Sequence, residues 1–285
     1  NFKKIGLTAL AGTLAATAYA QAGALSVSGT ARMEYQSSQT SATASTDSFA
    51  DNSSLVFSGS GELDNGFTVS MFQTQAGGTQ TSQGVTLDMG DMGKLSLMDG
   101  TNAGGIATIS DKVPNGGEQP WDDIGVTGEH GTPEQGVASP HSGNRLAYST
   151  TAGGATISAQ MDFAQNSPTT SLAIQMPNLI EGLNVGAGIA TDQDTASTEQ
   201  DIETYFVTYA MGSVSVGYQF TEVDATAANE DIERTAYGIS FAVNDNMSIG
   251  YGVSDVEFEE FTPDEESTGL GMTYTSGGMT VGVQH

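Results

Sequence analysis

The sequence predicts an all-β protein, a transmembrane antiparallel β-barrel. Three observations support this prediction: apolar residues recur at every second position in fifteen short segments, tight and long connections alternate between these segments, and the chain begins with an export signal. A period of two places apolar side chains on one face of a strand and polar ones on the other. A transmembrane barrel needs this pattern, because one face meets lipid and the other the lumen.

The segment from Leu25 to Tyr35 shows the alternation, with apolar residues separated by Ser, Thr, Arg and Glu. Asp64-Asn65-Gly66 predicts a tight hairpin turn, because Asn-Gly tolerates the positive φ of such turns. The opposite face of the predicted strands carries mostly Ser, Thr, Gly, Gln and charged residues. The fifteen predicted strands are Leu25–Tyr35, Leu55–Leu63, Phe67–Met71, Val85–Met89, Lys94–Met98, Asn144–Ser149, Ala155–Phe163, Ser171–Met176, Leu183–Ala190, Ile202–Ala210, Ser213–Phe220, Glu233–Val243, Met247–Ser254, Thr268–Thr275 and Met279–His285.

The connections alternate in length: tight ones follow the even-numbered predicted strands and longer polar ones the odd-numbered strands. Outer-membrane barrels have this asymmetry, and usually an even number of strands. Because His285 lies within a running strand, we expect a sixteenth strand beyond the given sequence. The predicted barrel domain spans residues 23–285 and lacks this last strand.

The amino terminus predicts a secretory signal peptide over residues 1–22. Lys3 and Lys4 precede an apolar run, and small residues follow, so that cleavage is expected after Ala20 or Ala22. The apolar run is too short to span a bilayer as a helix. We therefore expect export through a cleaved signal peptide.

The composition excludes several classes of function. Seven Lys and Arg residues stand against 34 acids, for a net charge of -27 over 285 residues. Binding to nucleic acid is excluded because it needs a basic surface. Cysteine is absent, so the chain has no disulfide or thiol chemistry.

The break from Asp99 to Gly143 is the longest segment without a strand pattern. It contains four of the seven prolines, the only tryptophan and seven acids. A loop of this length in a compact domain argues against the fold unless the loop is functional. By strand count it is the third outer connection, and we expect it to be functional.

Three segments resemble the Gram-negative general diffusion porins: Leu25–Gly29, Phe57–Phe67 and Asn144–Thr150, the last at the point where the chain re-enters the wall after the long break. The resemblance implies an outer-membrane channel for small hydrophilic solutes and ions, in contact with outer-membrane lipids and assembled as a homotrimer. It also implies that the third outer loop folds into the lumen and sets its acids against basic residues of the wall.

The candidate pore residues follow from this arrangement. Rings of charged side chains select ions by local potential, so the excess of acids predicts a preference for cations. The loop candidates are Asp111, Glu118, Trp121, Asp122, Asp123, Glu129 and Glu134, and the basic wall candidates are Arg32, Lys94, Arg145 and Arg234.

Other functions stay open or are disfavoured. A non-channel surface barrel, such as an adhesin or structural envelope protein, and a substrate-specific channel remain alternatives. An enzyme is not expected, because the three histidines lack zinc-site spacing and no nucleophile elbow or phosphate loop occurs. No cofactor or specific metal site is expected, although acidic outer loops could bind divalent cations diffusely.

Overall fold

A computed structural model describes residues 4–9, 14–15, 25–38, 46–101, 104–115, 144–163, 169–195, 198–225, 231–259 and 264–285. These residues form one antiparallel sheet of 17 strands with two short 3₁₀ helices. Within these ranges no helix has the length and apolar character to cross a membrane.

The elements follow one another around the sheet. The strands are β1 (Lys4–Ala9), β2 (Leu14–Ala15), β3 (Leu25–Ser38), β4 (Thr46–Glu62), β5 (Thr68–Ala76), β6 (Thr79–Asp88), β7 (Lys94–Asp99), β8 (Arg145–Ala152), β9 (Ala155–Asp162), β10 (Thr170–Ile180), β11 (Leu183–Thr195), β12 (Thr198–Met211), β13 (Val214–Ala225), β14 (Ile232–Asn244), β15 (Met247–Phe258), β16 (Glu265–Ser276) and β17 (Met279–Gln284), and the helices are η1 (Gly90–Met92) and η2 (Gly105–Ile109).

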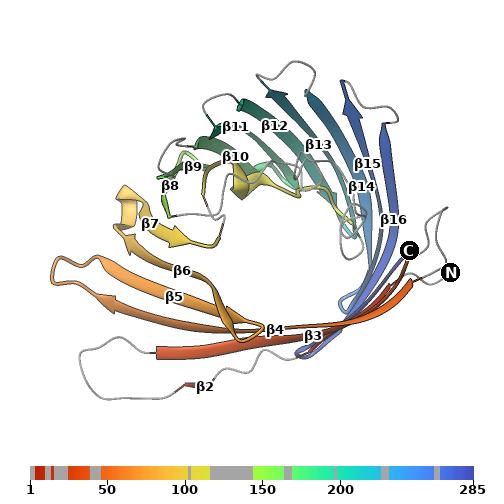
Figure 1. Ribbon diagram of the computed structural model, residues 1–285, viewed down its shortest axis with the longest axis horizontal. Coiled ribbons are helices and arrows are strands. Elements are labelled where there is room, and N and C mark those ends of the chain that lie inside the picture. Colours follow the sequence, from red (N-terminus) through yellow and green to blue (C-terminus); the bar gives the residue numbers. More distant parts are fainter. Residues whose placement is uncertain are drawn as a thin grey trace.

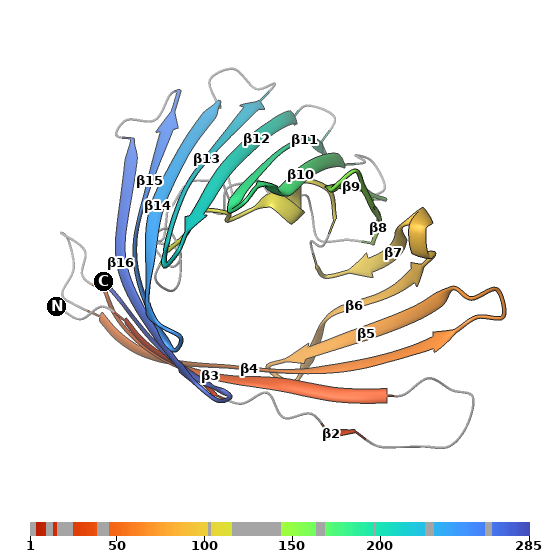
Figure 2. The ribbon, with the colours of Figure 1, turned by 180° about the vertical axis from the view of Figure 1, so that it is seen from behind.

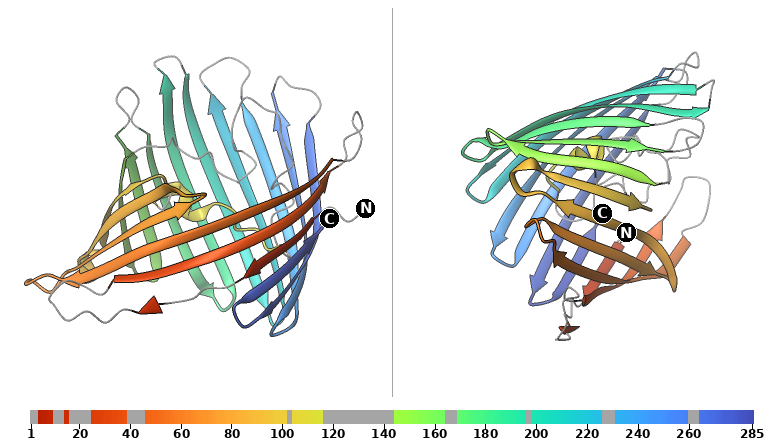
Figure 3. Two further views of the ribbon diagram at one scale, coloured as in Figure 1. Left: turned by 60° about the horizontal axis from the view of Figure 1, so that its bottom comes forward. Right: turned by 90° about the vertical axis from the view of Figure 1, so that its left-hand side faces the viewer.

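The predicted all-β fold and its fifteen strands are confirmed as β3 to β17. Each of these strands pairs antiparallel with the next along the chain, and together they surround a central space (Figure 1). Figure 3 shows that β3 to β6 are strongly tilted, whereas β10 to β16 stand more upright. Every described strand thus has neighbours for its backbone N–H and C=O groups, which hydrocarbon cannot satisfy.

Strand β1 lies between β17 and β3 in the sheet, where a sixteenth strand following β17 would also be expected to pair. It pairs with β17 through Lys4↔Gln284 to Ala9↔Met279 and with β3 through Lys4↔Gln36 to Ala9↔Ala31. An unpaired strand edge accepts any antiparallel segment that supplies N–H and C=O groups. Because β1 lies in the predicted signal peptide, cleavage after Ala20 would remove this partner from β3 and β17. The signal peptide itself stays a prediction.

One predicted long connection is a tight turn in the structure. Strands β5 and β6 extend through the polar residues 73–83 and meet at Gly77-Gly78, with φ of 58° and 81°. Two consecutive positive φ values suit a two-residue hairpin. The prediction was wrong here because these Gln, Thr and Ser side chains are accommodated in paired strands, so polar composition did not indicate a loop.

The two faces of each strand follow the predicted alternation, with every second side chain pointing outward and the others pointing inward. On β14, Ile239 faces outward and is 45% exposed, whereas Ala236 faces inward and is fully buried. Ser240, next to Ile239, shares the inward parity of Ala236. The outward faces of β12 to β16 therefore present the apolar side chains that contact lipid.

The orientation of β14 predicts opposite outcomes for neighbouring substitutions. Ile239→Arg should lower the unfolding free energy by about 2–4 kcal/mol, because it places a charge in hydrocarbon, whereas Ser240→Arg should cost much less. Urea unfolding of the barrel refolded in phospholipid bilayers measures both. An equal cost for the two variants would contradict the assigned faces.

Candidate functional site

The candidate site lies where residues 104–115, here called the inserted segment, run inside the barrel against β9 to β15. Figure 2 shows η2, the start of this segment, on the inner side of β10 and β11. Ile106 and Ile109 are fully buried there. Complete burial of such a side chain stabilises a fold by about 1.5–3 kcal/mol. The two isoleucines therefore fix the segment to the wall.

The wall beneath Ile106 and Ile109 is apolar. Their buried neighbours are Ala173, Ala190, Ile202, Phe206, Val223, Ile232 and Val256. All seven lie on inward-facing positions, which we had predicted to be mostly polar. That expectation was wrong for this part of the wall, because β10 to β15 pack on both faces: lipid outside and the inserted segment inside.

Inward-facing glycines make room for the inserted segment. A Cβ atom at Gly188 would lie 2.9 Å from Ile109 Cδ1, and one at Gly217 or Gly238 would collide with Pro114. No real Cβ tolerates such contacts without a shift of its neighbours. Small side chains at these wall positions are therefore a condition for the segment to lie flat.

Polar side chains of the wall hold the backbone of the segment. The Ser158 hydroxyl accepts a hydrogen bond from the Gly105 N–H at 2.9 Å, and the Ser171 hydroxyl accepts one from the Ile106 N–H at 3.3 Å. Gln219 accepts from the Lys112 N–H and donates to the Ile109 carbonyl, both at 2.9 Å. These contacts pair backbone groups that would otherwise be costly to bury.

Arg145 joins the beginning of the long connection to its end. Its side chain is 3% exposed, its Nε lies 3.7 Å from Asp162 Oδ2, and its Nη1 donates a hydrogen bond to the Thr101 carbonyl. Asp162 is 1% exposed. Arg145 therefore acts as a buried anchor, and not as a charge displayed on the wall.

Arg234 is also buried, at 1% exposure. Its Nε donates to the Ser254 hydroxyl at 3.0 Å, and it lies across from Thr221 on β13. Thr221 and Thr204 share a hydrogen bond of 2.8 Å. Arg234 thus belongs to a buried polar cluster on the inner face of the wall.

The other two basic wall candidates are more accessible. Arg32 on β3 forms an ion pair of 3.0 Å with Glu34, with side chains 32% and 15% exposed. Lys94 pairs with Asp88 at 3.0 Å beside the short turn between β6 and β7, with side chains 58% and 38% exposed. Of these two, Arg32 lies within the length of its strand, where a permeating ion could sense it.

The acidic candidates are only partly described. Asp111 lies in the inserted segment with a positive φ of 49°. The remaining candidates, Glu118, Trp121, Asp122, Asp123, Glu129 and Glu134, lie outside the described residues. Their pairing with Arg32 or Arg145 therefore stays a prediction.

Sequence reasoning missed Lys112 and Gln219. Burial lowers the pKa of the Lys112 ammonium, and the neighbouring Asp111 carboxylate opposes this shift. Lys112 Nζ lies 6.0 Å from the centre of the Phe206 ring.

Ile106 and Ile109, an apolar pair within a polar break, were a sequence signal that could have located the docked part of the long connection.

Many acids face away from the lumen. On β12 to β16 the outward positions nearest the long connections carry carboxylates: Asp201, Glu203, Glu222, Asp224, Glu233, Asp255, Glu257 and Glu266. Several face each other across strands, such as Glu222 and Glu233. Carboxylates are disfavoured in hydrocarbon, so they mark the outer limit of the lipid-facing band. The net charge of the chain is therefore not a measure of the charge in the lumen.

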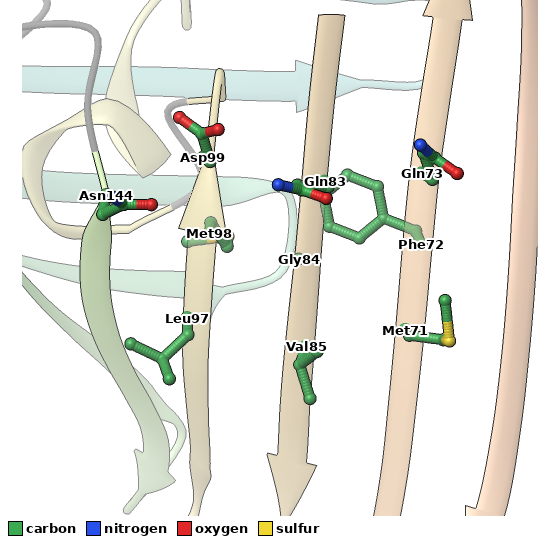
Figure 4. Close-up of a pocket in the computed structure, with 10 residues that line it drawn as sticks. All are labelled: Met71, Phe72, Gln73, Gln83, Gly84, Val85, Leu97, Met98, Asp99 and Asn144. Atoms are coloured by element: carbon green, nitrogen blue, oxygen red, sulfur yellow. The ribbon is translucent and has the colours of Figure 1, made fainter. Parts of the chain in front are cut away.

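A hollow of about 390 Å³ lies in the wall formed by β5, β6 and β7. Gly84 is at its centre, and Figure 4 shows Phe72 extending from β5 toward this glycine. Gln73, Gln83 and Asp99 supply its polar groups. In the part of the chain that the structure describes, no three His, Cys, Asp or Glu side chains gather as metal ligands.

An antiparallel barrel with lipid-facing apolar residues and a chain segment inside it defines a channel-forming outer-membrane protein. A family model described as Gram-negative porin matches residues 6–284. The chain therefore belongs to the Gram-negative porins. Membership supports an outer-membrane diffusion channel over a non-channel barrel or an enzyme.

Solved porins share the fold at low identity. The anion-selective porin from Comamonas acidovorans is 13% identical with a TM-score of 0.66, and the match covers 100% of this chain and 99% of that one. A porin refined at 1.8 Å is 15% identical with a TM-score of 0.59, covering 100% and 98%. OmpT of Vibrio cholerae is 12% identical with a TM-score of 0.60, covering 95% and 99%. No curated protein sequence matches the chain.

The buried anchor predicts a distinct stability pattern. Arg145→Met should lower the unfolding free energy by about 3–5 kcal/mol, because Asp162 is left as a buried charge without this counterion. The double variant Arg145→Met with Asp162→Leu should recover most of that loss. Urea unfolding in bilayers measures both. If the double variant is as unstable as Arg145→Met, the pair is not the anchor.

Proposed function

We propose that the chain forms a passive, cation-preferring diffusion channel for small hydrophilic solutes and ions. Solutes cross without a chemical step. The long connection between β7 and β8 excludes large solutes by size, and the local electrostatic potential selects among ions. The family supports the channel, and the sign of the selectivity is our inference from the charges described below.

The main support for cation preference is that three of the four basic wall candidates have carboxylate neighbours. Arg32 lies 3.0 Å from Glu34, and Lys94 lies 3.0 Å from Asp88. Arg145 is buried beside Asp162. Opposite charges at such distances largely cancel beyond their immediate surroundings, so the wall has little net positive field.

The acids of the long connection then determine whether the channel prefers cations or anions. Glu118, Asp122, Asp123, Glu129 and Glu134 follow the inserted segment in the sequence. Residues 104–115, which precede these acids in the sequence, are docked inside the barrel, and we propose that the acids act on ions in the lumen. Carboxylates in that position would attract cations to the narrowest part of the passage.

The fold alone does not determine selectivity. The Comamonas acidovorans porin has this fold and is anion-selective. Selectivity therefore depends on individual side chains, which at 13% identity have mostly been replaced. A measurement on this chain is needed for the sign.

Planar-bilayer recording in a KCl gradient tests the proposal. The wild-type reversal potential should favour K⁺, and replacing the five loop acids by Gln or Asn should reduce the K⁺-to-Cl⁻ permeability ratio about twofold or more, as Coulomb energies at several ångströms imply. Glu222→Gln with Glu233→Gln is the matched control, because both side chains face outward. A wild-type preference for Cl⁻ contradicts the proposal, as does a larger effect in the control.

We also propose that the channel is a homotrimer in outer-membrane lipid. The proposal rests on the resemblance to general diffusion porins. Light scattering of the detergent-solubilised protein should give the mass of three chains after subtraction of the detergent. A monomeric mass under conditions that preserve conductance would contradict it.

A further inference from the structure

Gln219 forms two hydrogen bonds with the inserted segment, whereas Ser158 and Ser171 form one each. Gln219 is 1% exposed on the inner face of β13, across from Phe206 on β12. Its Nε2 donates to the Ile109 carbonyl at 2.9 Å and lies 3.4 Å from the Thr204 hydroxyl. Its Oε1 accepts from the Lys112 N–H at 2.9 Å. One amide therefore binds both ends of the turn from Ile109 to Lys112.

This turn needs an external support. Asp111 has a φ of 49°, a left-handed conformation that is uncommon for a non-glycine residue. Such a conformation persists where surrounding contacts enforce it. Gln219 bonds to the residue after Asp111 and to the residue two positions before it, so it bridges the strained position.

The turn also places a charge inside the barrel. The backbone of Lys112 is held by Gln219, and its Nζ lies 6.0 Å from the ring of Phe206, the cross-strand partner of Gln219. The next residues are held as well, since Pro114 packs at Gly217 and Gly238. The backbone on both sides of the Lys112 side chain is thus held against the wall.

We propose that Gln219 is a positioning residue for ion selectivity: it holds the 109–112 turn so that the Lys112 ammonium opposes the passage of cations. Lys112 is the group that the ion senses, and Gln219 acts through it. The inference rests on the proposed channel function. It holds whether the wild-type channel prefers cations or anions, because it concerns the change in the K⁺-to-Cl⁻ permeability ratio between variants.

Reversal potentials of three variants in a KCl gradient test the inference. Lys112→Met retains the apolar stem and removes the charge, and should raise the K⁺-to-Cl⁻ permeability ratio about twofold. Gln219→Leu should shift the ratio in the same direction. The double variant should match Lys112→Met, because Gln219 has no separate influence once the charge is gone.

The controls separate positioning from a merely structural role. Gln36→Leu changes the same residue type on β3, which the strands β14 to β17 separate from β13 in the sheet, and should leave the ratio unchanged. Loss of stability or altered conductance in Gln219→Leu without a shift in reversal potential would overturn the inference. A shift of equal size in the Lys112→Met background, or no shift in Lys112→Met itself, would also overturn it. The wild-type sign is recorded separately, so a failure of the proposed cation preference is distinguishable.

Discussion

The constraint on which the whole structure depends is that backbone N–H and C=O groups in hydrocarbon must find partners within the protein. Antiparallel pairing from β3 to β17 satisfies these groups, and β1 supplies partners to the two outermost strands. With the backbone arranged in this way, side chains alternate between lipid and lumen. Each side chain of a strand then faces either hydrocarbon or the aqueous lumen.

The inserted segment modifies this simple division. Where it docks, the inner face of β10 to β15 is a protein interior, with Ile106 and Ile109 buried against the wall. Glycines at 188, 217 and 238 leave space for the chain, and Ser158, Ser171 and Gln219 pair its backbone. Apolar burial and hydrogen bonding act together, so the inserted segment is packed against the wall as part of a core.

The docking of the inserted segment also affects which charged side chains of the wall are exposed to the lumen. Arg145 and Arg234 face inward but are buried in polar contacts, whereas Arg32 stays partly accessible beside Glu34. Carboxylates on β12 to β16 lie outside the barrel near the long connections. In this chain with a net charge of -27, Arg32, Lys94 and Arg145 thus each lie beside a carboxylate.

The sequence by itself determined the strand number, the alternation of faces and the place of the long connection, because these depend on local periodicity and turn chemistry. Asn65-Gly66 shows this: its turn follows from conformational preference alone. Only the tertiary structure decided that Arg145 is buried and that Gln219 binds Lys112, since residues 107 positions apart meet through strand pairing and docking. Parity assigns a residue to the inner face, but it does not tell whether that face meets water or another part of the chain.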